Sequence, residues 1–291
     1  MTPQSQLTSA DLRLARAARR SRALWDASTA ETRPAIDLFG VRISNLPLDR
    51  ATANLLDAAR QRRRTRAVFV NAHVVNEMAA RQDYAATVAA ADTILADGSG
   101  LAIAARLAGT PLADNVNGTD LFPLLAAMAN EAGEKVFLLG GAPGVAEAAA
   151  AKLAQFGLGG AIAGTHHGHF RRHDDDEQSV IDKVNASGAS IVLVGLGVPL
   201  QDTWIAANHH RLTPSVAIGV GGLFDYFAGR VSRAPFWLRS IGLEWMWRLM
   251  LEPRRLARRY LVGNAVFLVH AAREAARVRR QRITTPRPSE A

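Results

Sequence analysis

The chain contains no cysteine. That absence excludes disulfide bonds and thiolate metal sites, and it fits a protein of a reducing compartment. Residues 1–33 lack the basic-then-apolar pattern of a secretory signal peptide. The longest apolar run near the C-terminus, at 260–272, has about 13 residues, whereas a membrane-spanning helix needs roughly 18–20. We therefore expect a chain that does not cross a membrane.

Two nucleotide-binding signatures are also missing. The chain has no Walker A loop and no complete G-x-G-x-x-G fingerprint. A nicotinamide oxidoreductase would need that fingerprint, followed by an acid that binds the ribose. The sequence supplies neither convincingly, and we expect no bound cofactor.

Charge is unevenly distributed along the 291 residues, whose net charge is +9. Residues 67–228 include 8 basic and 16 acidic residues, whereas 1–66 include 13 and 6, and 229–291 include 14 and 4. An acidic body with two basic ends suits an anionic partner such as phospholipid, nucleic acid or a phosphorylated ligand. With 48 % hydrophobic residues, the body can form a sizeable core.

Short apolar runs alternate with helical stretches through this body. The alternation predicts an α/β fold, with a Rossmann-like, mostly parallel sheet and helices on both faces. We expect strands at 67–71, 93–96, 135–140, 190–195 and 216–219, and helices at 73–90, 119–130, 145–155 and 176–186.

Ligands of parallel sheets bind at the carboxyl ends of the strands. There the sequence places Asn71, the pair Asp97-Gly98, and glycine turns at 140–141, 195–197 and 219–222. A carboxylate at this edge can act as a general base. Asp-Gly is also a common turn pair that caps a following helix, so both interpretations of Asp97 stay open on spacing alone.

Glycine turns allow backbone amides to approach a phosphate or a ribose closely. One such turn is weak evidence, but two at strand ends of one sheet favour a nucleotide site. Gln201 follows the turn at 195–197, at a predicted helix start. Its amide can bind a sugar or diphosphate, or it can simply face solvent.

Four histidines, at 166, 167, 169 and 173, precede an acidic run at 174–177. Their spacing lacks the i, i+4 pattern of a zinc pair on a helix. The acids are typical of a solvated helix start. We therefore predict no metal site in this segment.

Residues 229–262 combine eight arginines with Trp237, Trp245 and Trp247. Tryptophan favours the headgroup level of a membrane, and each basic residue near an anionic leaflet contributes about 1 kcal/mol. Basic helices also bind nucleic acid, but the acidic body would repel a polyanion. We predict two helices separated by prolines and a third reaching 282, which together form a membrane-associating appendage.

A series of short motifs follows in order: Asn71, then segments 96–100, 117–120, 137–141, 195–201, 219–225, 233–235 and 242–245. In this order they resemble the WecG/TagA/CpsF glycosyltransferases, from about residue 37 to 262. The resemblance implies a GT-E-type core and inverting transfer from a UDP-sugar to a saccharide on a polyprenyl diphosphate. It places the enzyme in the synthesis of an exopolysaccharide or another cell-surface polysaccharide.

The resemblance also implies roles for individual residues, with Asp97 as the catalytic base and late arginines closing the site at the membrane. The implied catalytic residues are Asp97, Gln201, Arg248, Arg255 and Arg258. The implied substrate-binding residues are Asn71, Asn115, Asn117, Gly118, Gly140, Gly141, Gly197, Gly221, Gly222 and Asp225.

Two positions depart from the family pattern. Phe69 stands where many relatives have threonine, and Asn115 stands where many have arginine. Both positions line the site in relatives, so the donor or acceptor preference of this chain is expected to differ, and we do not assign the sugar.

We expect four segments: a basic extension without fixed structure (1–36), a catalytic core (37–228), the appendage (229–282) and a disordered tail (283–291). The enzyme is expected to be metal-independent and peripheral on the inner face of the bacterial cytoplasmic membrane. Its expected partners are the UDP-sugar, the polyprenyl-linked acceptor and anionic lipid but not nucleic acid, with homo-oligomers also allowed. The alternative function is a nucleotide-binding Rossmann module with a basic tail that binds nucleic acid.

Overall fold

The computed structural model describes residues 35–284 except 236 and 239–241, so nearly all of the expected extension and most of the expected tail lie outside the described residues. Residues 283 and 284, the first two of the expected tail, are helical. An eight-stranded sheet has the order β1-β2-β4-β3-β8-β7-β5-β6. β1 and β2 are antiparallel, and every other neighbouring pair is parallel. The strands are Ala35–Leu38 (β1), Val41–Ser44 (β2), Thr65–Val70 (β3), Thr93–Ala96 (β4), Val136–Gly140 (β5), Ile162–His166 (β6), Ile191–Gly195 (β7) and Val216–Gly219 (β8).

Both faces of the sheet are apolar because successive strand residues point to opposite sides. In β3, Ala67 and Phe69 belong to the core on one side, whereas Val68 and Val70 belong to the core on the other. The first side is covered by Leu48–Arg60 (α2), Gly118–Ala132 (α6), Val145–Ala154 (α7) and Leu223–Phe227 (α10). The second is covered by Ala72–Ala80 (α3), Gln82–Ala89 (α4), Ser99–Leu107 (α5), Asp175–Ala186 (α8), Leu200–Asn208 (α9) and Gly263–Thr284 (α14).

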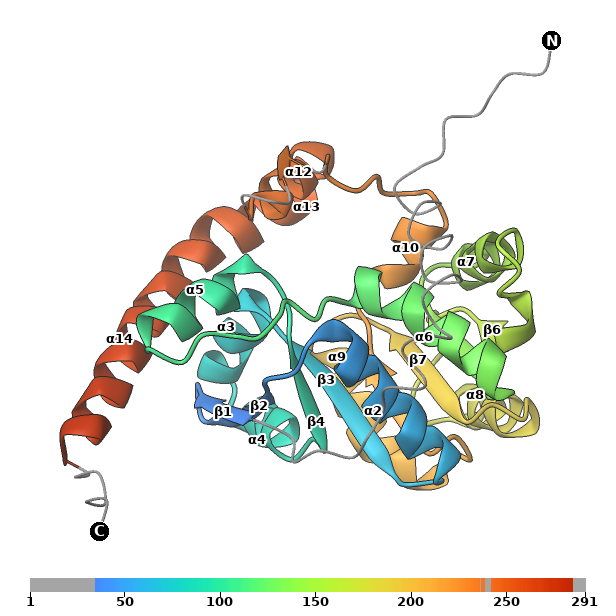
Figure 1. Ribbon diagram of the computed structural model, residues 1–291. Coiled ribbons are helices and arrows are strands. Elements are labelled where there is room, and N and C mark those ends of the chain that lie inside the picture. Colours follow the sequence, from blue (N-terminus) through green and yellow to red (C-terminus); the bar gives the residue numbers. More distant parts are fainter. Residues whose placement is uncertain (1–34, 236, 239–241, 285–291) are drawn as a thin grey trace.

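This architecture confirms the predicted α/β class and its mostly parallel sheet (Figure 1). The prediction of one helix over 73–90 was wrong, because Arg81 is extended, with φ −140° and ψ 105°, and separates α3 from α4. The break turns Tyr84 into the core, where its hydroxyl donates to Asp202 Oδ2 at 2.6 Å. β1, β2, β6, α2 and α5 were not among the predicted elements.

The C-terminal appendage consists of Glu244–Leu251 (α12), Pro253–Ala257 (α13), a π-helical turn at Arg258–Val262 (η3) and the long helix α14. Figure 1 shows α14 running alongside α5 and α3. Phe267 and Ala271 of α14 are buried in the same core cluster as α3 and α5. The Phe267 ring also lies against the Cα of Gly100, where an added Cβ would come within 3.2 Å of it. Packing therefore joins α14 to the core across the expected boundary at 229.

Phe267→Ala is expected to lower the free energy of unfolding by about 3–5 kcal/mol, because it removes a buried ring and leaves a cavity. The neighbouring Leu268→Ala is the matched control, since Leu268 is 54 % exposed and a surface substitution changes stability by about 0.5 kcal/mol or less. Urea unfolding measures both. Equal, small losses would show that α14 is not part of the cooperative core.

The sheet opens a crevice at the carboxyl ends of its parallel strands. The chain leaves β4 in one half of the sheet and re-enters at β5 in the other half, so connections from the two halves diverge above the central strands. Within the described residues, no helix combines the length and the apolar character required to cross a bilayer.

Candidate active site

A cleft of about 560 Å³ lies at this edge of the sheet, within the usual range for small-molecule sites. It collects ten of the residues singled out from the sequence: Asn71, Asp97, Gly118, Gly141, Gly197, Gln201, Gly221, Gly222, Asp225 and Arg248. It also contains Phe69, at which the chain departs from the family pattern, and further residues of the predicted glycine turns, namely Gly195, Leu196, Gly219 and Val220. The residues that were not expected at the site are Ala142, Gly168, His169, Val198, Leu256 and Arg259.

Asp97 is held at the mouth of the cleft by β3 and β4. Its backbone amide donates to Val70 O at 2.8 Å, which continues the pairing of the two strands by one residue. Its Oδ2 accepts from Asn71 Nδ2 at 3.1 Å. Asn71 caps α3, because its Oδ1 accepts from His73 N at 3.1 Å and Val74 N at 3.2 Å. The cap fixes the orientation of the Asn71 amide, and its NH2 group therefore points at the carboxylate.

The turn after Asp97 is shaped by Gly98 and Asn115. Gly98 has φ +91°, a conformation that side-chain-bearing residues rarely adopt. Its N–H donates to Asn115 Oδ1 at 2.7 Å. Asn115 is not among the cleft-lining residues. The structure thus gives Asn115 a contact to the Asp97-Gly98 turn, where the sequence suggested contact with substrate.

The pKa of Asp97 is raised, chiefly because burial disfavours its charged form. Glu244 acts in the same direction, whereas the hydrogen bond from Asn71 and the charges of Arg248 and Arg259 act against it. A raised pKa makes a carboxylate a stronger proton acceptor in its ionised form. The site therefore combines a carboxylate of raised pKa with two cations whose charges act against that shift.

Gln201 holds the glycine turn after β8. It is 3 % exposed, and its Oε1 accepts from Gly221 N at 2.7 Å. The neighbouring Asp202 is also buried and accepts from Tyr84, and burial raises the pKa of Asp202 to about 6. Both side chains fill the space where Gly219 would carry a Cβ. Gln201 therefore both lines the cleft and fixes its floor.

Bare backbone forms the part of the cleft between β5, β6 and β7. Gly140 has φ +147°, and an added Cβ would collide with Gly195. Gly141 N donates to Gly195 O at 3.1 Å, and Gly168 N donates to Gly141 O at 2.8 Å. Gly140 itself does not line the cleft, but it lets β5 and β7 end close together, so that Gly141 and Gly195 form adjacent parts of its lining.

The opposite wall combines Asp225 with Arg248 of the appendage. α10 begins directly after Gly222, and Asp225 is in its first turn. An added Cβ on Gly222 would lie 3.6 Å from Asp225 Oδ2 and 3.8 Å from Arg248 Nη2. A cation thus approaches the glycine turn from α12.

The π-helical turn η3 brings Arg259 to the cleft. Arg258 and Arg259 are both exposed, but of these two only Arg259 lines the cleft, and the side chain of Arg255 lies outside what the structure describes. The charge of Arg259 acts on Asp97 and, together with burial, lowers the pKa of His73 to about 4. π turns often mark functional sites. Sequence spacing assumes an α-helical register and could not anticipate this change of face.

Asn117 caps α6 through its side chain and does not line the cleft, whereas the following Gly118 does. Gly118 lies against Phe69, whose ring would be 3.9 Å from a Cβ at that position. Phe69, the departure from the family pattern, therefore forms an apolar wall beside Asp97 and Asn71.

The appendage is tied to the core by polar contacts around the cleft. Arg233, whose side chain is 3 % exposed, pairs with Asp120 at 3.2 Å and with Glu244 at 3.0 Å. Ser99 Oγ donates to Gly242 O at 2.9 Å, and Asn76 Nδ2 donates to Gly263 O at 2.7 Å. Buried pairs of this kind fix geometry more than they add stability. They hold α12 and η3 over the strand ends.

A sequence profile of the glycosyl transferase WecG/TagA/CpsF family matches residues 36–281. The chain belongs to this family. It is 35 % identical over 202 residues to an N-acetylglucosaminyldiphosphoundecaprenol N-acetyl-beta-D-mannosaminyltransferase of Bacillus spizizenii, covering 69 % of this chain and 77 % of that protein. It is 28 % identical over 247 residues to the protein of the same name from Staphylococcus aureus strain NCTC 8325, covering 84 % of this chain and 95 % of that protein.

As a member of the WecG/TagA/CpsF family, the chain is a glycosyltransferase. The cleft brings a buried carboxylate, glycine-rich backbone turns and arginines into one space. A general base and nearby cations are groups that glycosyl transfer can use. The alternative of a nucleotide-binding module without catalytic activity is set aside by this membership.

The acidic run after the histidines forms a helix start, as expected. Asp174 caps α8 and accepts from Asp176 N at 2.9 Å, and Arg171 pairs with both acids. Glu177 differs from the expectation, because it is buried and accepts from Trp204 Nε1 at 2.7 Å. Within the part of the chain that the structure describes, no group of three His, Asp or Glu residues is arranged to hold a metal ion.

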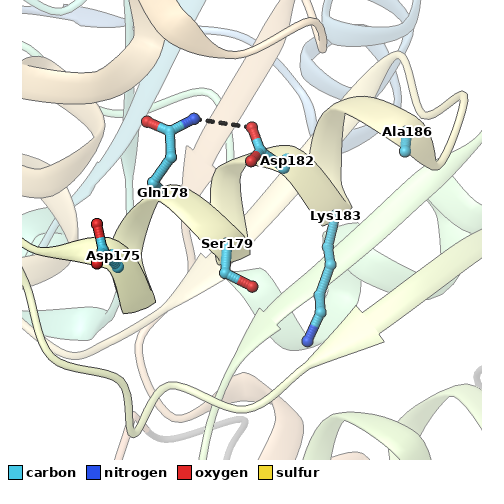
Figure 2. Close-up of a pocket in the computed structure, with 6 residues that line it drawn as sticks. All are labelled: Asp175, Gln178, Ser179, Asp182, Lys183 and Ala186. Carbon is cyan, nitrogen blue, oxygen red and sulfur yellow. Dashed lines mark hydrogen bonds between the residues drawn. The ribbon is translucent and has the colours of Figure 1, made fainter.

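A second, shallow depression lies on the outer face of α8. Figure 2 shows its side chains along one helix, with Gln178 Nε2 donating to Asp182 Oδ1 at 2.7 Å. It shares no residue with the cleft.

Proposed function

We propose that this enzyme transfers a sugar from a UDP-sugar to a saccharide on a polyprenyl diphosphate, with inversion at the anomeric carbon. The observation that carries the proposal is the position of Asp97, which faces Arg248 and Arg259 in one cleft bounded by glycine turns. The names of the two relatives describe transfer of N-acetylmannosamine to N-acetylglucosaminyl-diphosphoundecaprenol. They support the same acceptor class for this chain.

In the proposed step, Asp97 accepts the proton of an acceptor hydroxyl as the hydroxyl oxygen bonds to the anomeric carbon. The bond from that carbon to the diphosphate oxygen breaks at the same time, and the nucleoside diphosphate leaves with the electron pair. Asn71 orients the carboxylate. The amides of the glycine turns, together with Arg248 and Arg259, offset the charge that develops on the leaving group.

The acceptor is expected to reach the cleft from a membrane surface. Large apolar side chains are exposed on the appendage, at Met250, Leu251, Leu261, Val262 and Leu268. The first four belong to α12 and η3, which together with α13 carry arginines, and Leu268 follows on α14. Apolar side chains that insert at the headgroup boundary, next to cations that pair with anionic lipid, are the features of an interfacial segment. We infer that the appendage binds the membrane and presents the lipid-linked saccharide to Asp97, as a peripheral enzyme of polysaccharide synthesis.

The double variant Met250→Ser, Leu261→Ser is expected to weaken binding to vesicles containing phosphatidylglycerol about tenfold or more, because each inserted apolar side chain contributes about 1.5–3 kcal/mol. Vesicle sedimentation measures it. The matched control Met250→Leu, Leu261→Met retains apolar area and should bind like the wild type. Raising the salt concentration should weaken binding of all three proteins. Unchanged binding of the serine variant would rule out this surface as the lipid contact.

A panel of UDP-sugars, first screened by thermal shift and then assayed with a polyprenyl-diphosphate saccharide in liposomes, tests the proposed reaction. Turnover with at least one UDP-sugar, retained in EDTA, is the expected result. Loss of turnover in EDTA would contradict the metal-independent mechanism. Salt-dependent DNA binding without any affinity for UDP would instead favour a nucleic-acid role.

A further inference from the structure

The helix α3 contacts both the proposed base and the appendage. Its N-cap, Asn71, orients the Asp97 carboxylate through a hydrogen bond of 3.1 Å. In the second turn of the helix, Asn76 Nδ2 donates to Gly263 O at 2.7 Å, across 187 positions of sequence. Gly263 directly follows the π-helical turn η3, which carries Arg259. One helix of nine residues therefore connects the two sides of the cleft.

Gly263 is the residue that closes the π turn. Its N–H donates to Arg258 O, five residues earlier, and this i→i−5 spacing is that of a π-helix. Compared with a continuous α-helix, one extra residue in a turn rotates the segments on its two sides by about 100° relative to each other. The π turn therefore determines which side chain of η3 faces the cleft, and that side chain is Arg259.

The amide of Asn76 is explained by its bond to the appendage and not by stability. Its Oδ1 is buried and, among the described residues, meets no hydrogen-bond donor. A buried acceptor in that state is costly, and each such atom in a folded protein requires an explanation. An apolar side chain would avoid the cost but could not donate to Gly263. The bond from Nδ2 supplies that explanation.

His73 reports the position of Arg259 relative to α3. It lies three residues before Asn76, so that both side chains share a face of the helix. Burial, together with the charge of Arg259, lowers the pKa of His73 to about 4. The guanidinium is therefore close enough to α3 to disfavour a proton on this imidazole.

We propose that Asn76 is a positioning residue, which holds the π turn through the Gly263 carbonyl and thereby keeps Arg259 in the cleft. α3 then fixes the proposed base at its first residue and the proposed cation through its second turn. The effect on turnover rests on the proposed function, because it assumes that Arg259 acts on the leaving group. The position of the arginine does not rest on it.

A double-mutant cycle of Asn76→Ala and Arg259→Ala tests this role. Asn76→Ala alone should lower kcat in liposomes about tenfold to a hundredfold, the scale expected when a catalytic group is displaced by about an ångström. In the Arg259→Ala background it should lower kcat by no more than about twofold to threefold, since the arginine that it positions is already absent. Losses that multiply instead would show a general structural effect and would overturn the proposal.

Asn185→Ala is the matched control. Asn185 Nδ2 also donates to a distant carbonyl, Arg211 O, at 2.9 Å, and Asn185 lies outside the cleft. Its loss should leave kcat close to that of the wild type. Urea unfolding shows whether each variant is folded.

NMR titration of His73 gives a second measurement that requires no turnover. Asn76→Ala should raise the pKa of His73 toward its value in Arg259→Ala, because the arginine is no longer held beside it. The double variant should raise it no further than Arg259→Ala alone. An unchanged pKa in Asn76→Ala would overturn the positioning role and leave the proposed function standing. A wild-type chain without turnover would overturn the proposed function, whereas the titration would still decide whether Asn76 positions Arg259.

Discussion

Asp97→Asn is expected to lower kcat by about 10²-fold to 10⁴-fold, the usual contribution of a positioned general base. The amide has nearly the shape of the carboxylate and can still meet Asn71, but it cannot accept the acceptor's proton. Affinity for UDP should stay close to that of the wild type, because the diphosphate is proposed to contact the arginines and glycine turns instead. Single-turnover kinetics and UDP titration separate the two effects.

Asp182→Asn is the matched control for this substitution, because Asp182 lies on the outer face of α8 and outside the cleft (Figure 2). It should retain full turnover. If Asp97→Asn also retained full turnover, Asp97 would have no part in proton transfer. The acceptor hydroxyl would then need another base.

The raised pKa of Asp97 predicts both a pH profile and a stability effect. Activity should fall as the pH is lowered through the folded-state pKa, and this limb should lie above the ordinary range of an aspartate. The contribution of Asp97 to folding stability has the opposite pH dependence. Because the folded state binds this proton more tightly than the unfolded state, the stabilising contribution is present at low pH and is lost as pH rises through the folded pKa. Asp97→Asn should therefore be at least as stable as the wild type at neutral pH.

Arg259→Ala is expected to lower kcat by about 10²-fold to 10³-fold, the range found when a donor to a developing anion is removed. Arg259 lines the cleft opposite Asp97, where its charge would meet the departing diphosphate. Arg259→Lys should recover only part of the loss, since an ammonium group lacks the planar fork of a guanidinium. Turnover in liposomes measures both variants.

Arg258→Ala provides a control of the same residue type at the adjacent position. Arg258 is exposed and does not line the cleft, so kcat should stay within a factor of about two to three. The family resemblance implies functional arginines at 248, 255 and 258, whereas the cleft is lined by Arg248 and Arg259. If kcat fell strongly in Arg258→Ala and little in Arg259→Ala, the arginine that acts in transfer would be the one given by sequence spacing and not the one that lines the cleft.

The strands of the body could be predicted because a sheet buried on both faces requires continuous apolar runs. β7 and β8 are such runs, each flanked by glycine. β6 has no such pattern, since it is an edge strand with only partly buried residues and ends in histidine. The short hairpin β1–β2 is also at an edge, so each strand needed only a few apolar residues.

The sequence could predict the site residues that directly follow a strand. Parallel strands bring their carboxyl ends to one edge of the sheet, whatever their order in it. Asp97, Asn71 and the glycine turns met there for that reason. The sequence could not separate residues that face the cleft from those that hold it. Asn115 and Asn117 share the residue type of Asn71, yet they bond to the backbone of neighbouring turns. Only tertiary contacts distinguish these roles.

The packing of Phe267 on Gly100 has a mechanical consequence. Gly100 is in the first turn of α5, three residues after Asp97. Tension on α14 from a lipid surface would thus be transmitted, through one ring and one turn of helix, to the carboxylate that proton transfer is proposed to use. Membrane binding and the orientation of Asp97 would then be coupled. An enzyme released from the bilayer would be expected to lose the orientation of the carboxylate before it unfolds.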